Sequence, residues 1–213
     1  MSGAALSALM AQVFPPAVAR GICAVARADV ARLFHVEHSA VKSAVPARQR
    51  EFAAGRIAAR AAMGRDLPVV MAEDRAPVWP EGMAGSITHA GGWALAVAGT
   101  AERLIGIDLE VDAALPAEVW ETVLTNSERA ALRDMPDVGR WARVIFSAKE
   151  CAYKVQYPRS NQVFGFEVFE VTLEPDSGVF TAVFQRDIAP FAAGDCLRGR
   201  YSIGGGFILT GIA

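Results

Sequence analysis

Acidic side chains alternate with apolar ones in the short segment GIDLE, residues 106–110. On a β-strand, residues two positions apart lie about 6.5 Å from each other on one face, so Asp108 and Glu110 would share a site. Carboxylate oxygens suit Mg²⁺, which uses one or two carboxylates and takes its other ligands from water and substrate phosphates. The exposed face of an amphipathic strand has the same pattern, and the motif alone favours that simpler interpretation.

A second polar group lies further along the chain, in FSAKECAYK, residues 146–154. On a helix, Glu150 and Lys154 are one turn apart, which places a base or metal ligand beside a proton donor or phosphate clamp. Two structural interpretations compete with this one. Ser147 and Glu150 fit a capping box, and Glu150 with Lys154 fits an ion pair worth about 0.5 kcal/mol or less.

Lysine is scarce in this sequence. Lys and Arg together number 21, yet the only lysines are Lys42, Lys149 and Lys154. Where arginine is the default cation, a retained lysine indicates a need for a compact donor that can exchange a proton. The scarcity therefore favours function for the segment that holds Lys149 and Lys154, and it assigns no role to Lys42.

Other side chains could bind an anion. His89 follows Thr88 at the end of a predicted strand, where an imidazole can contact a phosphate or serve as an ordinary surface group. Arginine recognises phosphate through two parallel hydrogen bonds, although any single arginine here is equally explained as solvated charge on a helix. The candidate arginines are Arg48, Arg56 and Arg75.

Composition bounds the class of protein. At about 150 residues per domain, 213 residues make one large domain or two small ones that share a core. The formal net charge of -2 gives no basic excess for nucleic-acid binding. Three dispersed cysteines argue against a disulfide framework or a thiolate zinc site. The first residues lack a basic signal-peptide region and no apolar run approaches about 20 residues, so we expect a cytoplasmic protein without a membrane partner.

The order of predicted elements indicates an α+β fold, because strands and helices do not alternate regularly. A helix over 46–65 opens at Pro46 and turns Phe52, Ile57, Ala61 and Ala62 to one face. The other elements follow in chain order. They are a helix and a strand within residues 3–31, a hairpin of 85–90 with 93–99, a strand over 104–111, a helix opened by the capping box Thr125 to Glu128, a helix over 141–156 with a second start at Ser147 left open, and a β-meander after Pro158.

Taken together, these segments resemble the 4'-phosphopantetheinyl transferases of the surfactin- and enterobactin-synthesis type. The paired signatures of that family correspond here to GIDLE and FSAKECAYK, in the family's order and at its separation. Three upstream blocks and the C-terminal strands are also similar to the family. The upstream blocks are RQREFAAGRIAAR (48–60), PVWPEGMAGSITHAGG (77–92) and WARVIF (141–146).

The resemblance implies a pseudo-dimer of two similar halves, each a small antiparallel sheet packed on a long helix, with coenzyme A in the cleft between them. The N-terminal half, on the adenylate side, would comprise residues 1–101. The C-terminal half, with the metal and catalytic motifs, would comprise residues 102–213. The implied reaction moves the 4'-phosphopantetheine group of coenzyme A to a serine of an apo acyl or peptidyl carrier protein and releases adenosine 3',5'-bisphosphate. A monomer is expected.

Residue roles also follow from the resemblance. Asp108, Glu110 and Glu150 would hold Mg²⁺, with Mn²⁺ as a substitute, against the pyrophosphate. Glu150 would act as the base toward the carrier serine, and Lys154 would neutralise the pyrophosphate and protonate the leaving group. The expected coenzyme A contacts are Arg48, Arg56, Arg75, Thr88, His89, Asp108, Lys149, Glu150 and Lys154.

Three positions depart from the family pattern. Arg75 stands where lysine is usual, Thr88 where serine is common, and Cys151 where a small residue is usual. All the metal and catalytic positions are kept. Two alternatives remain open from the residues: another Mg²⁺-dependent phosphotransferase or pyrophosphatase acting on coenzyme A, and a non-catalytic module that binds coenzyme A or a carrier.

Overall fold

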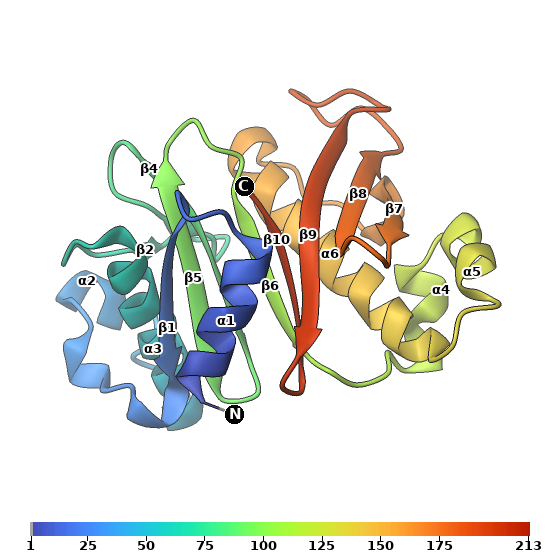
Figure 1. The fold of residues 1–213 in the computed structure, drawn as a ribbon. Helices are drawn as coiled ribbons and strands as arrows, with labels where there is room; N and C mark the ends of the chain where they lie inside the picture. The colour runs from blue at the N-terminus through green and yellow to red at the C-terminus, as the bar shows by residue number, and fades with distance from the viewer. Residues whose placement is uncertain (1) are drawn as a thin grey trace.

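The computed structural model describes residues 2–213 and confirms an α+β fold (Figure 1). No helix within that range is long and apolar enough to cross a membrane. The α-helices are α1 Gly3–Val13, α2 His35–His38, α3 Pro46–Met63, α4 Trp120–Val123, α5 Asn126–Leu132 and α6 Val138–Ser160. The strands are β1 Ala19–Ala24, β2 Val70–Met71, β3 Pro77–Val78, β4 Met83–Ala90, β5 Trp93–Thr100, β6 Gly106–Val111, β7 Phe169–Glu174, β8 Val179–Phe184, β9 Cys196–Gly204 and β10 Phe207–Ile212.

The N-terminal sheet has the strand order β1-β5-β4, and both pairings are antiparallel. The predicted hairpin is confirmed as β4 and β5. Gly91 and Gly92 join these strands with φ angles of 53° and 81°. Two consecutive positive φ angles characterise the tight turn that best matches strand twist, and glycine adopts them without steric cost.

Helix α3 confirms the helix predicted over 46–65. It begins at Pro46 and ends before Gly64, which adopts a left-handed conformation with φ 62°. The predicted apolar face is partly confirmed, because Phe52 and Ala62 are buried. Ala61, however, is exposed. The buried stripe of α3 is instead filled mainly by other alanines, whose small side chains let β1 and β5 approach the helix closely.

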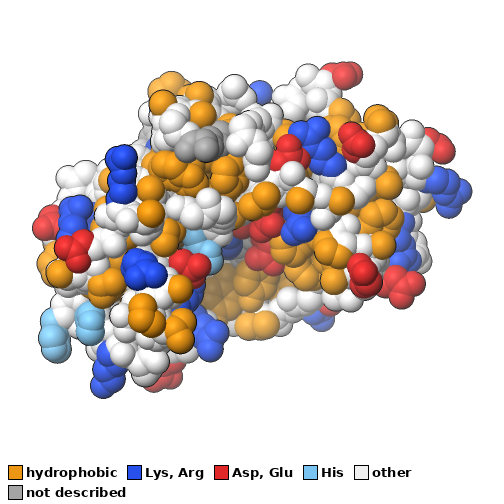
Figure 2. All heavy atoms as spheres, turned by 90° about the horizontal axis from the view of Figure 1, so that it is seen from below, with side chains coloured by type: hydrophobic (Ala, Val, Ile, Leu, Met, Phe, Trp, Pro, Cys, Tyr) orange, Lys and Arg blue, Asp and Glu red, His pale blue; other side chains and the backbone are white. Residues whose placement is uncertain are grey.

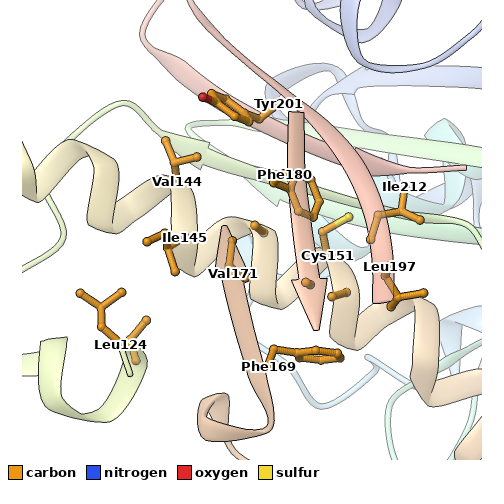
Figure 3. Packing of buried hydrophobic residues seen from close by; sticks show 14 of the residues in the cluster. Leu124, Val144, Ile145, Cys151, Phe169, Val171, Phe180, Leu197, Tyr201 and Ile212 are labelled. Atoms are coloured by element: carbon orange, nitrogen blue, oxygen red, sulfur yellow. The ribbon is translucent and has the colours of Figure 1, made fainter. Parts of the chain in front are cut away.

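The C-terminal sheet has the strand order β6-β10-β9-β8-β7, with antiparallel pairing throughout. This confirms the predicted meander and places β6 beside the last strand of the chain. Helix α6 packs across the sheet, and its residues Val144, Ile145 and Cys151 belong to one buried cluster with Phe180 and Val171 of the strands (Figure 3). The helix is continuous through Ser147, so a second start at that residue is wrong.

Side chains rather than backbone pairs join the two sheets. The Ser86 hydroxyl of β4 accepts the Ile107 N–H at 3.2 Å, and the Thr88 hydroxyl accepts the Leu109 N–H at 3.1 Å. Both donors belong to β6, so the acidic strand of the C-terminal sheet lies against the edge of the N-terminal one. Helix α1 covers this junction and buries Leu6 and Met10 in a core shared by both sheets.

A buried carboxylate stands at the centre of the N-terminal part of the fold. Glu37 of α2 accepts the Phe34 N–H at 3.0 Å and the Val69 N–H at 2.8 Å. Arg60 of α3 donates Nη1 to both Glu37 oxygens, at 3.1 and 2.9 Å, and Nη2 to the Arg32 carbonyl at 2.9 Å. We call these residues the N-terminal node.

An equivalent arrangement occurs in the C-terminal part. The predicted capping box is confirmed, because Glu128 of α5 accepts the Thr125 N–H at 2.7 Å and the Thr125 hydroxyl accepts the Glu128 N–H at 3.2 Å. The other Glu128 oxygen accepts the Val171 N–H at 2.7 Å. Lys149 of α6 completes the C-terminal node, with its Nζ 2.8 Å from Glu128 Oε2.

Candidate functional site

Helix α6 presents one polar stripe to strand β6. The stripe residues are spaced alternately three and four positions apart, which keeps them on one face of the helix. The stripe consists of Arg140, Arg143, Ser147, Glu150 and Lys154. Opposite it, acidic residues at alternate positions of β6 and its exit are Asp108, Glu110 and Asp112.

Asp108 is the most enclosed of these acids, with 4% of its surface exposed. Its Oδ1 accepts hydrogen bonds from Lys154 Nζ at 2.6 Å and from the Thr88 hydroxyl at 3.2 Å. Its Oδ2 accepts one from the Ser147 hydroxyl at 2.8 Å. Ser147 therefore orients Asp108 from the middle of α6, which excludes the capping-box interpretation of Ser147 and Glu150.

Lys154 stands beside Asp108 as a cation. Burial alone would lower the pKa of Lys154. The Asp108 carboxylate, with help from Glu150, outweighs burial and raises that pKa above its usual value. Its ammonium also donates to the Ile107 carbonyl at 3.3 Å. The lysine predicted to pair with Glu150 is thus bonded to Asp108, and Glu150 acts on it through charge.

Glu110 and Glu150 add negative charge on the same face. Burial, and then the Asp108 charge, raise the pKa of Glu110 to about 7, although Arg143 and Lys154 oppose the rise. Burial also raises the pKa of Glu150, with Lys154 opposing. Carboxylates whose ionised forms are disfavoured in this way gain most from an added cation.

A divalent cation fits this donor set in a particular way. Among residues 2–213, no three acidic, histidine or cysteine side chains converge closely enough to hold a metal ion. The expected trio of Asp108, Glu110 and Glu150 is therefore not a preformed three-carboxylate cage. Mg²⁺ usually binds through one or two carboxylates together with substrate phosphates and water, and the hard oxygen donors on this face match that requirement.

The predicted anion-binding residues are partly brought together at the start of α3 and the end of β4. Arg48 Nη1 lies 3.0 Å from His89 Nε2 and 3.3 Å from Glu51 Oε2. Arginine has only donors, so Nε2 of His89 is the acceptor. Arg56, two turns further along α3, stacks over the Phe52 ring at 4.0 Å.

Arg56 lacks an anion for its charge. It is 6% exposed, and its Nε has no hydrogen-bond partner in the part of the chain that the structure describes. Burial lowers the pKa of Arg56 to about 10, with Glu37 opposing and Arg48 and Arg60 adding to the decrease. A buried cation of this kind is costly unless an anionic ligand joins it.

Lys149 does not join this site. Its Nζ donates to the Val123 carbonyl at 2.8 Å and the Phe166 carbonyl at 3.1 Å, and it pairs with Glu128 at 2.8 Å. An ammonium group has three protons, and these partners use all of them. The expectation that Lys149 contacts a phosphate does not fit this placement, because the side chain is 1% exposed.

Thr88 differs from expectation, whereas Arg75 lines a cleft. The Thr88 hydroxyl gives its only proton to Asp108, so it positions that acid and has none for a phosphate. Arg75 lies on the turn between β2 and β3, where its φ is 73°. There it lines a cleft of about 720 Å³ together with Lys154.

This cleft lies between the β2–β4 region and the second half of α6. Most of its lining is apolar or aromatic, and the Tyr157 hydroxyl donates to Asp74 across it. On the side seen from below in Figure 1, the surface is hollowed over a hydrophobic floor, with acidic and basic side chains gathered around the hollow (Figure 2). The two parts of the fold thus enclose space that charged groups border.

Sequence reasoning missed Arg140 and Arg143, which extend the stripe toward the start of α6. Arg143 Nη1 donates to Glu110 Oε2 at 3.1 Å, and Arg140 binds both oxygens of Asp112. The signal was present in the sequence as an alternating spacing of three and four between polar residues. It was hidden because arginine is so common in this chain that each one looked like ordinary surface charge.

Comparisons with known proteins identify the family of this chain. The 4'-phosphopantetheinyl transferase N-terminal domain matches residues 36–99, and the 4'-phosphopantetheinyl transferase superfamily matches residues 104–203. The chain is 39% identical to 4'-phosphopantetheinyl transferase Svp of Streptomyces mobaraensis, over 86% of this chain and 79% of that protein. It is 35% identical to 4'-phosphopantetheinyl transferase PptT of Mycobacterium tuberculosis, over 81% of this chain and 82% of that protein.

Enterobactin synthase component D of Escherichia coli O157:H7 is a further relative, 31% identical over 65% of this chain and 72% of that protein. Identity above 30% over most of both chains in the first two relatives, together with two family domains in order, leaves no other family in contention. The chain belongs to the 4'-phosphopantetheinyl transferase superfamily, whose enzymes transfer the phosphopantetheine group of coenzyme A to carrier proteins.

Proposed function

We propose that the two sheets and their long helices form a pseudo-dimer of residues 1–101 and 102–213, with coenzyme A bound between the halves. Its 3'-phosphate or adenylate end would lie at Arg48, Arg56 and His89. Its pyrophosphate would face Glu150 and Lys154 of α6. The uncharged arm would follow the 720 Å³ cleft, whose mainly apolar and aromatic lining suits it, past Arg75 at the rim.

The environment of Arg56 is the observation that best supports this proposal. Arg56 is a nearly fully buried arginine whose Nε is unpartnered, and it stands next to the exposed Arg48–His89 pair. Structural arginines in this protein, such as Arg60, are paired with a buried acid. Arg56 is not, so a dianionic phosphate brought by the substrate is the partner that would complete it.

We further propose that Asp108, Glu110 and Glu150 bind Mg²⁺, or Mn²⁺ in its place, together with the pyrophosphate. The ion would offset charge on the phosphoryl oxygens as the P–O bond breaks. Thr88, Ser147 and Lys154 hold Asp108 in one orientation through three hydrogen bonds. Asp108 is therefore held in place, whereas the other two proposed ligands, Glu110 and Glu150, are more exposed.

Glu150 is the proposed general base. Burial raises its pKa and so its affinity for a proton, as a general base requires, and the charge of Lys154 opposes that rise. It would take the proton of the carrier serine while the serine oxygen bonds to phosphorus. The P–O bond to adenosine 3',5'-bisphosphate breaks in the same displacement, and Lys154 would neutralise or protonate that leaving oxygen.

The carrier would be an apo acyl or peptidyl carrier protein. Relatives named for enterobactin synthesis favour siderophore or other secondary metabolism as the setting. The three free cysteines support a reducing, cytoplasmic compartment. A monomer is proposed, because one chain would already supply both halves of the site.

The test of the reaction is mass spectrometry of apo carriers incubated with the protein, coenzyme A and Mg²⁺. We expect one carrier of a panel to gain a phosphopantetheine group. The Glu150→Gln variant should lose at least about 100-fold in turnover, whereas the control Glu118→Gln, at an exposed site, should not. No gain with any carrier would overturn the proposal, and release of adenosine 3',5'-bisphosphate without a carrier would point to a pyrophosphatase.

A second measurement tests the placement of the substrate. Arg56→Gln should raise KM for coenzyme A about 10-fold or more, because it removes a charge-assisted phosphate contact. The same variant should change KM little for dephospho-coenzyme A, which lacks the 3'-phosphate. Equal effects on both substrates would place the 3'-phosphate elsewhere.

A further inference from the structure

Arg143 is the residue that connects strand β6, its exit and helix α6. Its Nη1 donates to Glu110 Oε2 at 3.1 Å, its Nε to the Ala113 carbonyl at 3.4 Å and its Nη2 to the Ala114 carbonyl at 3.2 Å. The guanidinium also lies 5.7 Å from the centre of the Phe146 ring. One planar group therefore fixes both the acid and the backbone that follows it.

Arg140 makes a similar clamp three residues earlier on α6, with a different target. Its Nε and Nη2 bind Asp112 Oδ1 and Oδ2 at 2.7 and 2.6 Å. Asp112 has no part in the proposed metal centre. The two arginines thus carry equal charge, lie on the same stripe and hold the same segment, but only Arg143 touches a proposed metal ligand.

We propose that Arg143 is a positioning residue for the metal centre, and this inference rests on the proposed function. By binding Oε2 of Glu110, it sets the orientation of that carboxylate and leaves Oε1 free to coordinate the cation. A glutamate side chain has several rotatable bonds, so an unsupported Glu110 would lose conformational entropy whenever it bound metal. Hydrogen-bonded partners of ligating carboxylates commonly contribute 10- to 100-fold in metal affinity.

Charge acts in the opposite direction, because a guanidinium near the metal repels it. The surroundings of Asp108 indicate that the gain from positioning should outweigh this repulsion. That acid already has a cation bonded to it at 2.6 Å, together with two hydroxyl donors, and it is the best oriented member of the set. Arg143 gives Glu110 the same kind of support, at a site where the side chain is less enclosed.

Mn²⁺ is the probe for the test, because free Mn²⁺ gives an electron paramagnetic resonance signal that falls when the ion is bound. Titrations use the full chain with coenzyme A present, after subtraction of binding by coenzyme A alone. We expect Arg143→Gln to weaken Mn²⁺ binding about 10-fold or more, and Arg143→Lys to weaken it severalfold. The matched control Arg140→Gln removes the same charge and should stay within about twofold of the original.

An Arg143→Gln affinity equal to that of Arg140→Gln, or tighter than the original, would overturn the inference. If Arg143→Gln does not fold, Arg143→Lys decides: it keeps the charge but cannot span Glu110 and Ala114, and an unchanged affinity would count against positioning. Original protein that transfers phosphopantetheine but binds no Mn²⁺ would overturn the metal centre and this inference together. Original protein that binds Mn²⁺ but transfers nothing would overturn only the proposed reaction.

Discussion

The N-terminal and C-terminal nodes bury the same carboxylate arrangement with different cations. In each, a glutamate near the start of a short helix accepts the backbone N–H of the residue just before that helix and another from a distant segment. The cation from the long helix is Arg60 in one node and Lys149 in the other. Each node therefore places one cation beside its buried glutamate, but the residue type differs between them.

What differs is the number and direction of acceptors. Lys149 faces three acceptors in different directions, two carbonyls and one carboxylate oxygen, which match the three protons of an ammonium group. Arg60 faces both oxygens of Glu37 and one carbonyl, which suit a planar fork. The comparison teaches that Lys149 was retained for the geometry of its donors inside the fold, and Lys154 alone supports the argument from lysine scarcity.

Removing the cation of the C-terminal node should have the largest effect. Lys149→Met leaves Glu128 charged and buried without its partner, so the free energy of unfolding should fall by about 3 to 5 kcal/mol. Arg60→Met should cost somewhat less, because Arg60 is 7% exposed against 1% for Lys149. Urea unfolding of both variants measures the difference. A loss below about 1 kcal/mol for Lys149→Met would show that the node does not hold this part of the fold together.

Glu110 differs from the buried glutamates Glu37 and Glu128, because it belongs to neither node. Its pKa is raised from 4.5 to about 7, so the folded protein binds this proton more tightly than the unfolded chain. Stability should therefore fall as the pH rises from about 4.5 through 7. Without metal, the original protein should lose about 2 kcal/mol relative to Glu110→Gln between pH 5 and 8. Parallel urea titrations of the two proteins test this, and identical pH profiles would refute it.

Exchanging the cation type in the N-terminal node should have the smallest effect. Arg60→Lys keeps the charge beside Glu37 but has no second prong for the Arg32 carbonyl, so a loss of about 1 kcal/mol is expected. Lys149→Arg in the other node should cost more, because a planar fork cannot reach three diverging acceptors in a closed space. Thermal unfolding midpoints rank the two exchanges. The reverse order would mean that packing, and not donor geometry, selects the cation.

Much of the fold was predictable because local rules agreed with tertiary packing. The helix after Pro46, the hairpin at Gly91 and Gly92, and the capping box at Thr125 all follow from backbone preferences of single residues or short patterns. The strand 106–110 was also predictable from its alternation. These features depend on neighbours in sequence, which a sequence displays directly.

The site was predictable as far as the family resemblance of its paired motifs reaches. That resemblance implied Asp108 and Lys154 in one site, and they lie together, but the partners of Lys149 and Thr88 come from segments 17 to 26 residues away in one case and 20 in the other. The helical spacing sets Lys149 apart from the polar stripe, but no local pattern names the acceptors that its side chain meets there. Arg143 was missed because arginine is common in this chain and because its contact with Glu110 joins residues 33 positions apart.

Helix α1 has a consequence for how the chain is made. It packs on β9 and β10, which are synthesised long after it because they lie near the other end of the described residues. At about 5 to 20 residues per second, the helix waits on the order of 10 to 40 s for the surface that covers its apolar side. The core that α1 shares with both sheets therefore stays incomplete until strand β10 is made and pairs with both β6 and β9.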